Sequence, residues 1–199
     1  MSSKPSFSKN YSGVLTPKSF IAKVRKEPNE LRRKMLLLGY VTSQLEKRKQ
    51  SVFLVGGQAV ETYTAGQFPT GDIDITTSDS ATMQKVLKSL GFEEIGMIWL
   101  NKKLGIAFHI VGYFAPEKPG TIRVGPYEVR IVGVEELILD RLSAAKFWSI
   151  PADYEKAKVL YDNFKKQLDV DYLRENAKKK KVEDFLLRVT ETHSLKFGR

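Results

Sequence analysis

The sequence predicts an α+β protein with a small mixed β-sheet, flanking helices and a C-terminal helical region. Short apolar runs and glycine turns alternate with helix-compatible segments between about residues 50 and 132. After residue 134 only helical periodicity is present. We therefore expect a flexible lead over residues 1–16, an α/β core with N-terminal helices over 17–133, and helices over 134–199 packed on that core.

Two helices are expected ahead of the sheet. Thr16 and Pro17 suit the N-cap and the first position of a short helix. Asn29 is a second N-cap candidate, because apolar residues recur at helical spacing from Glu30 to about Lys49. Lysine and arginine are frequent in this region. We interpret them as a solvent-exposed helix face, the alternative being a face turned toward nucleic acid.

The middle of the chain predicts a strand, a tight turn, a helix and a second strand. The first strand is the apolar run 52–55, which Gly56 and Gly57 end. A helix-compatible segment follows, and then the sequence Asp72-Ile-Asp74-Ile. Residues two apart on a strand point to the same face, so the two carboxylates are expected together and the isoleucines on the opposite, core face.

The remaining elements complete the sheet and then the helical region. We expect a helix over 80–90 that Asp79 or Ser80 caps and Gly91 ends. Further strands are expected over 92–100, 106–114 and 127–132, with a turn at 101–103 and a loop at 116–120. Helices are then expected over 134–148, 151–166, 170–178 and 182–193, with a frayed tail from Ser194.

The glycine turn and the aspartate pair together suit a metal-bound phosphate group. Gly56 and Gly57 have no side chains, so another group can approach the backbone closely. The N–H groups of the helix that follows, near Gln58, favour an anion. Asp72 and Asp74 could hold Mg²⁺, which binds carboxylates together with the phosphate oxygens of a substrate. Each part is common alone, and their combination and order are more specific.

This order of motifs resembles the nucleotidyltransferase superfamily of the DNA polymerase β type. The matching residues are the Gly56-Gly57 pair, Thr70, and the Asp72 and Asp74 pair, after an apolar strand and a short helix. The likeness is greatest to small prokaryotic nucleotidyltransferase-like proteins that include abortive-infection toxins of toxin–antitoxin pairs. The resemblance covers about residues 50–165 and implies a nucleotidyltransferase fold.

The resemblance also implies roles for individual residues. Asp72 and Asp74 would be catalytic and would hold Mg²⁺, with Mn²⁺ as the alternative ion. The candidate nucleotide-binding residues are Gly56, Gly57, Gln58, Thr70 and Lys146. For Lys146, which lies in the helix expected over 134–148, a solvent-exposed helix lysine is the alternative interpretation. Glu61, in the first turns after the glycines, is expected at the surface.

The sequence departs from the family at two positions. Related enzymes usually carry a third acidic residue on a neighbouring strand, and His109 occupies the expected place. Histidine can bind a metal or act as a base, so His109 is our third catalytic candidate; a structural, hydrogen-bonded histidine is the equal alternative. Glu128 on the next strand is a second, less favoured candidate for the third acidic residue. Phe68 stands where relatives often have an arginine.

The composition predicts a globular protein without disulfides or membrane-spanning segments. The chain has 199 residues, of which 42% are hydrophobic and 11% aromatic, so it predicts a globular protein. It has no cysteine, which excludes disulfides and thiolate metal sites. No long uncharged apolar run or signal-peptide core is present, so we expect no membrane association and a cytoplasmic location.

The net charge of +10 favours a polyanionic partner such as RNA or other nucleic acid. A lysine-rich surface without such a partner is an equal alternative. The cationic run 178–181 is expected to be exposed, with contact to nucleic acid as the second reading.

Three functions are consistent with these residues. The first is a metal-dependent nucleotidyltransferase that moves an NMP from an NTP to an acceptor, which could be RNA, a protein side chain or a small molecule such as an antibiotic. The second is a catalytically degenerate protein of the same fold that binds nucleotide or nucleic acid without turnover. The third is a toxin–antitoxin component that acts through a protein partner.

Overall fold

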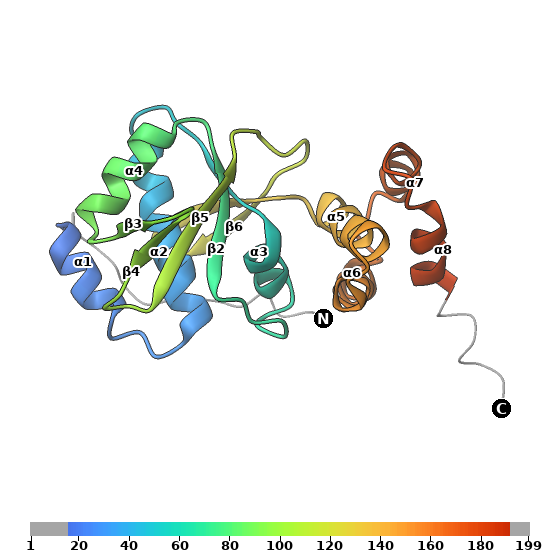
Figure 1. The fold of residues 1–199 in the computed structure, drawn as a ribbon, viewed down its shortest axis with the longest axis horizontal. Helices are drawn as coiled ribbons and strands as arrows, with labels where there is room; N and C mark the ends of the chain where they lie inside the picture. The colour runs from blue at the N-terminus through green and yellow to red at the C-terminus, as the bar shows by residue number, and fades with distance from the viewer. Residues whose placement is uncertain (1–15, 192–199) are drawn as a thin grey trace.

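The computed structural model describes residues 16–191, which form a mixed β-sheet with surrounding helices and a C-terminal set of helices (Figure 1). The predicted α+β class and the C-terminal helical region are confirmed. Most of the expected flexible lead, and the end of the chain from residue 192 with its expected frayed tail, lie outside the described residues.

Two helices precede the sheet, and both begin where the capping residues predict. In α1 (Pro17–Val24), Thr16 is the N-cap and its side chain accepts from the N–H of Ser19. In α2 (Glu30–Glu46), the Asn29 side chain accepts from the N–H of Arg32 at 2.8 Å. The second helix ends three residues before the expected Lys49, which has a left-handed backbone (φ 58°) as the chain turns into the sheet.

The seven strands form one sheet in the order β3-β4-β5-β2-β1-β7-β6. At its centre, β2 (Asp72–Thr77) pairs antiparallel with β1 (Val52–Leu54) and parallel with β5 (Ile106–Gly112). The next strand, β7 (Tyr127–Ile131), pairs parallel with β1. The strand that carries both aspartates is therefore an inner strand, between two neighbours.

Two sequence predictions about the strands were wrong, and both errors involve a glycine hairpin. The run 92–100 is two strands, β3 (Glu93–Ile95) and β4 (Ile98–Asn101), because Gly96 (φ 61°) opens a two-residue turn between them. The strand β6 (Gly120–Val124) was missed, although Gly125 (φ 59°) followed by Pro126 makes the same kind of turn into β7.

The helix α3 joins the sheet to the C-terminal helices. It spans Gly56–Tyr63, packs on β2, and also contacts the helices α5 (Val134–Phe147) and α6 (Pro151–Phe164). Its last residue, Tyr63, donates from its hydroxyl to the carbonyl of Val132 at 2.8 Å and packs edge-to-face on Phe164. Figure 1 shows α3 between the sheet and the C-terminal helices.

The other helices cover the sheet or extend the helical region. The helix α4 (Ser80–Ser89) packs against α2, and Asp79 caps it as expected. The helices α7 (Val170–Lys179) and α8 (Glu183–Glu191) pack on α5 and on each other. Within the described residues, no helix has both the length and the hydropathy needed to span a bilayer.

Candidate metal and nucleotide site

Two neighbouring strands bring two carboxylates and an imidazole together. Because β2 and β5 are parallel neighbours with Asp74 opposite His109, these side chains lie side by side. The His109 Nδ1 atom is 3.3 Å from Asp74 Oδ1. One ligand atom from each of Asp72, Asp74 and His109 lies within 4.8 Å of the other two. Within residues 16–191, no other group of three such side chains meets in this way.

The spacing and chemistry of this cluster fit a divalent cation. Ligands about 2.1 Å from one ion lie about 3 Å apart when adjacent and about 4.2 Å apart when opposite. The 3.3 Å between Asp74 Oδ1 and His109 Nδ1 is close to the adjacent value, all three ligand atoms lie within 4.8 Å of one another, and the side chains of Asp74 and His109 remain 20% and 28% exposed. Two carboxylates suit Mg²⁺, and the added imidazole nitrogen favours Mn²⁺ or another transition ion.

The electrostatics of Asp74 also favour a cation. Burial raises the pKa of Asp74 most, and the neighbouring Asp72 carboxylate raises it further. The hydrogen bond from the Gly57 N–H and the contacts with His109 oppose this rise in pKa without cancelling it. A bound cation would offset the repulsion between the two carboxylates, which is the chief unfavourable pair at the site.

The glycine turn lies directly against the aspartate pair. Gly56 has a left-handed backbone (φ 61°), and a Cβ atom at this position would overlap the carboxylate of Asp74. The N–H of Gly57 donates to Asp74 Oδ2 at 3.3 Å. The start of α3, where backbone N–H groups favour an anion, is therefore adjacent to the metal-binding carboxylates.

Thr70 and Gln58 flank the turn in different ways. The Thr70 hydroxyl donates to Asp72 Oδ1 at 3.4 Å, and a Cβ atom at Gly57 would lie 3.2 Å from that hydroxyl. Thr70 thus lies between the turn and the aspartates. The Gln58 side chain is 0% exposed, and its amide atoms have no hydrogen-bond partner among the described residues. Because the whole residue is buried, a contact between Gln58 and a nucleotide stays a prediction.

Two other candidates lie in separate interactions. The Lys146 ammonium contacts Asp184 Oδ1 at 2.7 Å and the carbonyl of Lys181 at 2.8 Å, which ties α5 to α8 and the residues before it. Its binding to a nucleotide stays a prediction and would require this contact to open. Glu128 is exposed and pairs with Arg123 across the β6–β7 hairpin at 3.3 Å, so it does not join the cluster.

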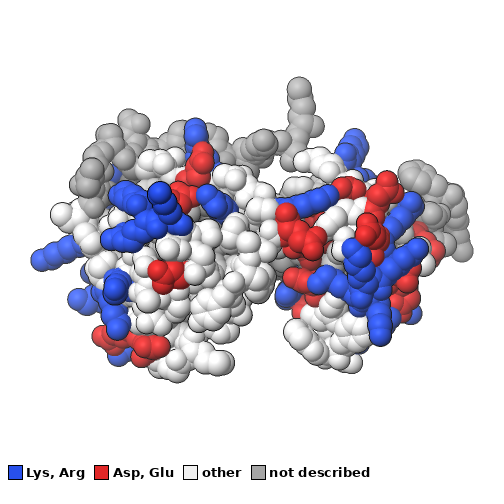
Figure 2. Space-filling view, turned by 90° about the horizontal axis from the view of Figure 1, so that it is seen from above, with Lys and Arg blue, Asp and Glu red and all other residues white. Residues whose placement is uncertain are grey.

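Two of the four lysines in the cationic run 178–181 are paired with local carboxylates. Lys179 contacts Glu175 at 2.7 Å, and Lys180 contacts Asp140 at 3.2 Å. Figure 2 shows basic and acidic side chains interspersed over the C-terminal helices, rather than a continuous basic surface. The geometry therefore adds no support to a nucleic-acid contact at this run.

Sequence reasoning missed a buried ion pair next to the site. Lys34 was expected on an exposed face and Glu61 at the surface, and both expectations were wrong. Their side chains are 1% and 5% exposed, and Lys34 Nζ lies 3.1 Å from Glu61 Oε2. The helical spacing of α2 could have predicted that Lys34 is buried. Lys34 precedes the inward-facing Leu38 by one turn and Val41 by two, so it lies on the same face of the helix.

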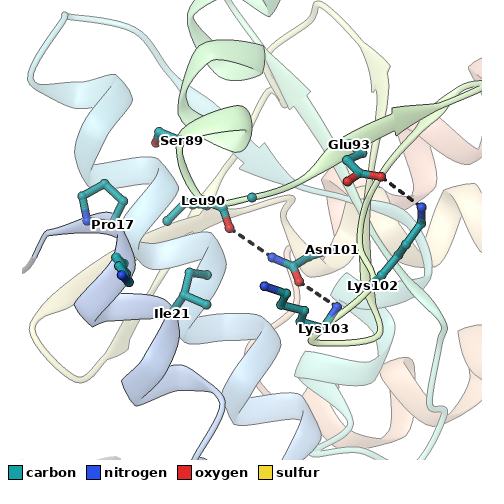
Figure 3. Close-up of a pocket in the computed structure, with 10 residues that line it drawn as sticks. Pro17, Ile21, Ser89, Leu90, Glu93, Asn101, Lys102 and Lys103 are labelled. Carbon is teal, nitrogen blue, oxygen red and sulfur yellow. Dashed lines mark hydrogen bonds and ion pairs between the residues drawn. The ribbon is translucent and has the colours of Figure 1, made fainter.

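Two pockets lie elsewhere in the structure. One, of about 470 Å³, is bounded by α1, the end of α4 and the turn after β4 (Figure 3). The buried Asn101 shapes this turn, because its amide donates to the carbonyl of Leu90 and accepts from the N–H of Lys103. The other, of about 650 Å³, lies among α2, α3, β6 and α6. Neither is lined by the aspartates or His109, so neither extends the cluster.

Comparisons with known proteins give distant structural similarities only. A scan of protein-family models and a search of curated proteins found no match. An antigenic nucleotidyltransferase-like protein from Paracoccidioides brasiliensis is similar with 14% identity and a TM-score of 0.49, over 67% of this chain and 77% of that chain.

The antibiotic-resistance factor ANT(2'')-Ia is similar in two structures. Its solution structure has 17% identity and a TM-score of 0.41, over 66% of this chain and 90% of that chain. The structure of its complex with adenylyl-2''-tobramycin has 16% identity and a TM-score of 0.43, over 77% of this chain and 94% of that chain. Because all three TM-scores are below 0.5, the geometry of the site carries the functional argument.

Proposed function

We propose that this chain is a metal-dependent nucleotidyltransferase that moves an NMP from an NTP to an acceptor hydroxyl. One observation carries the proposal. The glycine turn at the start of α3 contacts Asp74, and Asp74 contacts His109, so an anion-binding turn and a divalent-cation ligand set meet in one place. A metal-bound triphosphate requires both features side by side.

In this proposal each residue has a defined task. Asp72 and Asp74 would hold the cation, which when bound neutralises charge on the triphosphate and on the departing pyrophosphate. Free backbone N–H groups at the start of α3 would bind phosphate oxygens. The N–H of Gly57 could do so only by leaving Asp74 Oδ2. The acceptor oxygen forms a bond to the α-phosphorus while the bond from that phosphorus to the oxygen bridging to the β-phosphate breaks, and pyrophosphate leaves. His109 would accept the proton of the acceptor hydroxyl.

The net charge of +10 is the reason to propose RNA as the acceptor. This support is compositional, because two of the four lysines in the run 178–181 are paired with carboxylates and no continuous basic surface is seen there. A protein side chain or a small molecule is the alternative acceptor, and the identity of the labelled product decides among them.

Calorimetric titration with NTP and Mn²⁺ tests the site. Asp72→Asn combined with Asp74→Asn removes both negative charges with little change in side-chain volume, so the fold is expected to survive. We expect metal-dependent NTP binding in the wild type and none in the double variant. Binding of equal strength and equal metal dependence in a folded double variant would remove this site assignment.

A second candidate function is nucleotide binding without turnover. It is favoured by one observation, that the third member of the cluster is His109 and that no third carboxylate joins it within residues 16–191. A protein of this kind would bind NTP with Mn²⁺ and transfer no label to RNA, to protein or to a small acceptor. Label transfer in any of these would instead establish the enzyme.

A further inference from the structure

The ion pair between Lys34 and Glu61 is costly and needs a reason beyond stability. An ion pair buried to this extent loses the solvation of both charges, and replacing such pairs with apolar side chains is often neutral or stabilising. The exposed Glu30 adds a longer contact to Lys34 at 3.4 Å, from its place one turn earlier on α2. Hydrophobic burial alone would favour an apolar residue at either position.

The pair binds both backbone polar groups of a single residue. The Lys34 ammonium donates to the carbonyl oxygen of Thr70. Glu61 Oε2 accepts from the N–H of the same Thr70 at 3.2 Å. Thr70 lies in the connection between α3 and β2, where the regular backbone pairing of a helix or a strand does not hold it. One side chain from α2 and one from α3 therefore fix this connection.

Thr70 in turn contacts both parts of the candidate site, the aspartate pair and the glycine turn. Its hydroxyl donates to Asp72 Oδ1, and it lies against Gly57 on its other side. A shift of the Thr70 backbone would move the Asp72 carboxylate and open the space beside the glycine turn. Among the described residues, no hydrogen bond or ion pair links the side chains of Lys34 and Glu61 to Asp72 or to the glycines, so their side-chain contacts reach the site through Thr70.

We infer that Lys34 and Glu61 are positioning residues, which hold Thr70 so that Asp72 and the glycine turn keep the geometry of the cation and nucleotide site. This inference rests on the proposed function. Residues that orient metal ligands typically change metal affinity by about 10- to 100-fold when they are removed. A purely structural pair would change stability and leave the affinity of the folded protein unaltered.

The variant that tests this inference is Lys34→Met combined with Glu61→Leu. It removes both charges together, so no unpaired charge stays buried, and it keeps side chains of similar size. We expect a folded protein that binds Mn²⁺ about 10- to 100-fold more weakly than the wild type. Hydrogen exchange of the amides in residues 67–72, measured without metal, is expected to be faster.

Tyr63→Phe is the matched control on the same helix. It removes the buried hydrogen bond from α3 to the carbonyl of Val132 and leaves Thr70 untouched. We expect lower stability, with Mn²⁺ affinity and exchange of residues 67–72 as in the wild type. Should the Lys34 and Glu61 double variant fail to fold, Lys34→Gln combined with Glu61→Gln weakens the same contacts without leaving an unpaired buried charge, with an expected loss of affinity smaller than in the first double variant.

The outcomes separate this inference from the proposed function. A folded double variant with wild-type Mn²⁺ affinity and wild-type exchange would overturn the positioning role. Absence of Mn²⁺ binding in the wild type would overturn the metal site itself. In that case hydrogen exchange still reports whether the pair holds Thr70, because it needs no metal.

Discussion

At the scale of single residues, Gly56 and Asp74 depend on each other. Only glycine leaves room for the Asp74 carboxylate at this turn, and its left-handed backbone is easily adopted without a Cβ atom. Asp74 in turn accepts the N–H of the next glycine. The absence of side chains on the glycines thus lets the Asp74 carboxylate pack directly against the turn.

Gly56→Ala is expected to damage both stability and the site. The left-handed backbone costs about 1–2 kcal/mol for an alanine, and the new Cβ must displace Asp74. Gly96→Ala is the control, because Gly96 has the same φ of 61° with nothing within 4 Å of an added Cβ. Thermal melts and Mn²⁺ titrations should show destabilisation in both variants and weaker Mn²⁺ binding only at Gly56. Equal Mn²⁺ affinity in all three proteins would contradict this account of the turn.

His109→Ala is expected to separate turnover from binding. Loss of a general base typically costs about 10²- to 10⁴-fold in rate. At saturating Mn²⁺ the affinity for NTP should change much less, because a group that acts in the transition state contributes little to ground-state binding. Single-turnover kinetics with parallel calorimetry measure both quantities. Unchanged turnover in this variant would show that His109 is structural.

At the scale of elements, the sequence predicted what local signals determine. The caps Thr16, Asn29 and Asp79 correctly located the starts of three helices, because N-cap chemistry acts within one turn. The glycine turn and the aspartate strand followed from the same kind of local pattern. The hairpins at Gly96 and Gly125 were local too, but the run 92–100 was interpreted as one strand and residues 121–126 were assigned to no element.

The remaining features depend on contacts between distant segments. Lys34 and Glu61 are 27 residues apart and become a buried pair only when α2 packs beside α3. Asp74 and His109 meet because β2 and β5 are parallel neighbours, and strand order is not encoded in any local window. The pairing of Lys146 with Asp184 likewise requires the packing of α5 against α8.

The contact between the β5–β6 loop and α7 is expected to make stability depend on pH. Asp169 caps α7 and also contacts Lys118 at 2.7 Å, and the hydrogen bond from Lys118 is the main cause that lowers the pKa of Asp169. A carboxyl with a lowered folded-state pKa stabilises the fold above its unfolded pKa and loses that effect as pH falls through the folded pKa.

Asp169→Asn keeps a side chain that can cap the helix and removes the charge. Urea unfolding should show a variant less stable than the wild type near neutral pH. The difference in the free energy of unfolding between the two proteins should shrink as the solution becomes acidic. Asp171→Asn in the same helical turn is the control, with a smaller difference expected. A difference for Asp169→Asn that is constant with pH would show that its charge does not contribute.

At the scale of the whole molecule, the site lies where two inner strands of the sheet meet residues from two helices. The inner strands β2 and β5 supply the carboxylates and the imidazole, α3 supplies the anion-binding turn, and α2 reaches the same place through Lys34. The C-terminal helices contact α3 and tie their own basic residues to carboxylates. The net charge of +10 therefore gives an overall attraction for polyanions without defining a single binding surface.

The most direct test of a nucleotidyltransferase is the fate of each phosphate of the NTP. The protein is incubated with Mn²⁺, total RNA and one NTP at a time, labelled at either the α- or the γ-phosphate, with the Asp72→Asn and Asp74→Asn double variant in parallel. The account predicts that α-label enters RNA or another acceptor and γ-label leaves as pyrophosphate, with neither outcome in the double variant. Acceptors that carry γ-label, or transfer that the double variant retains, would contradict it.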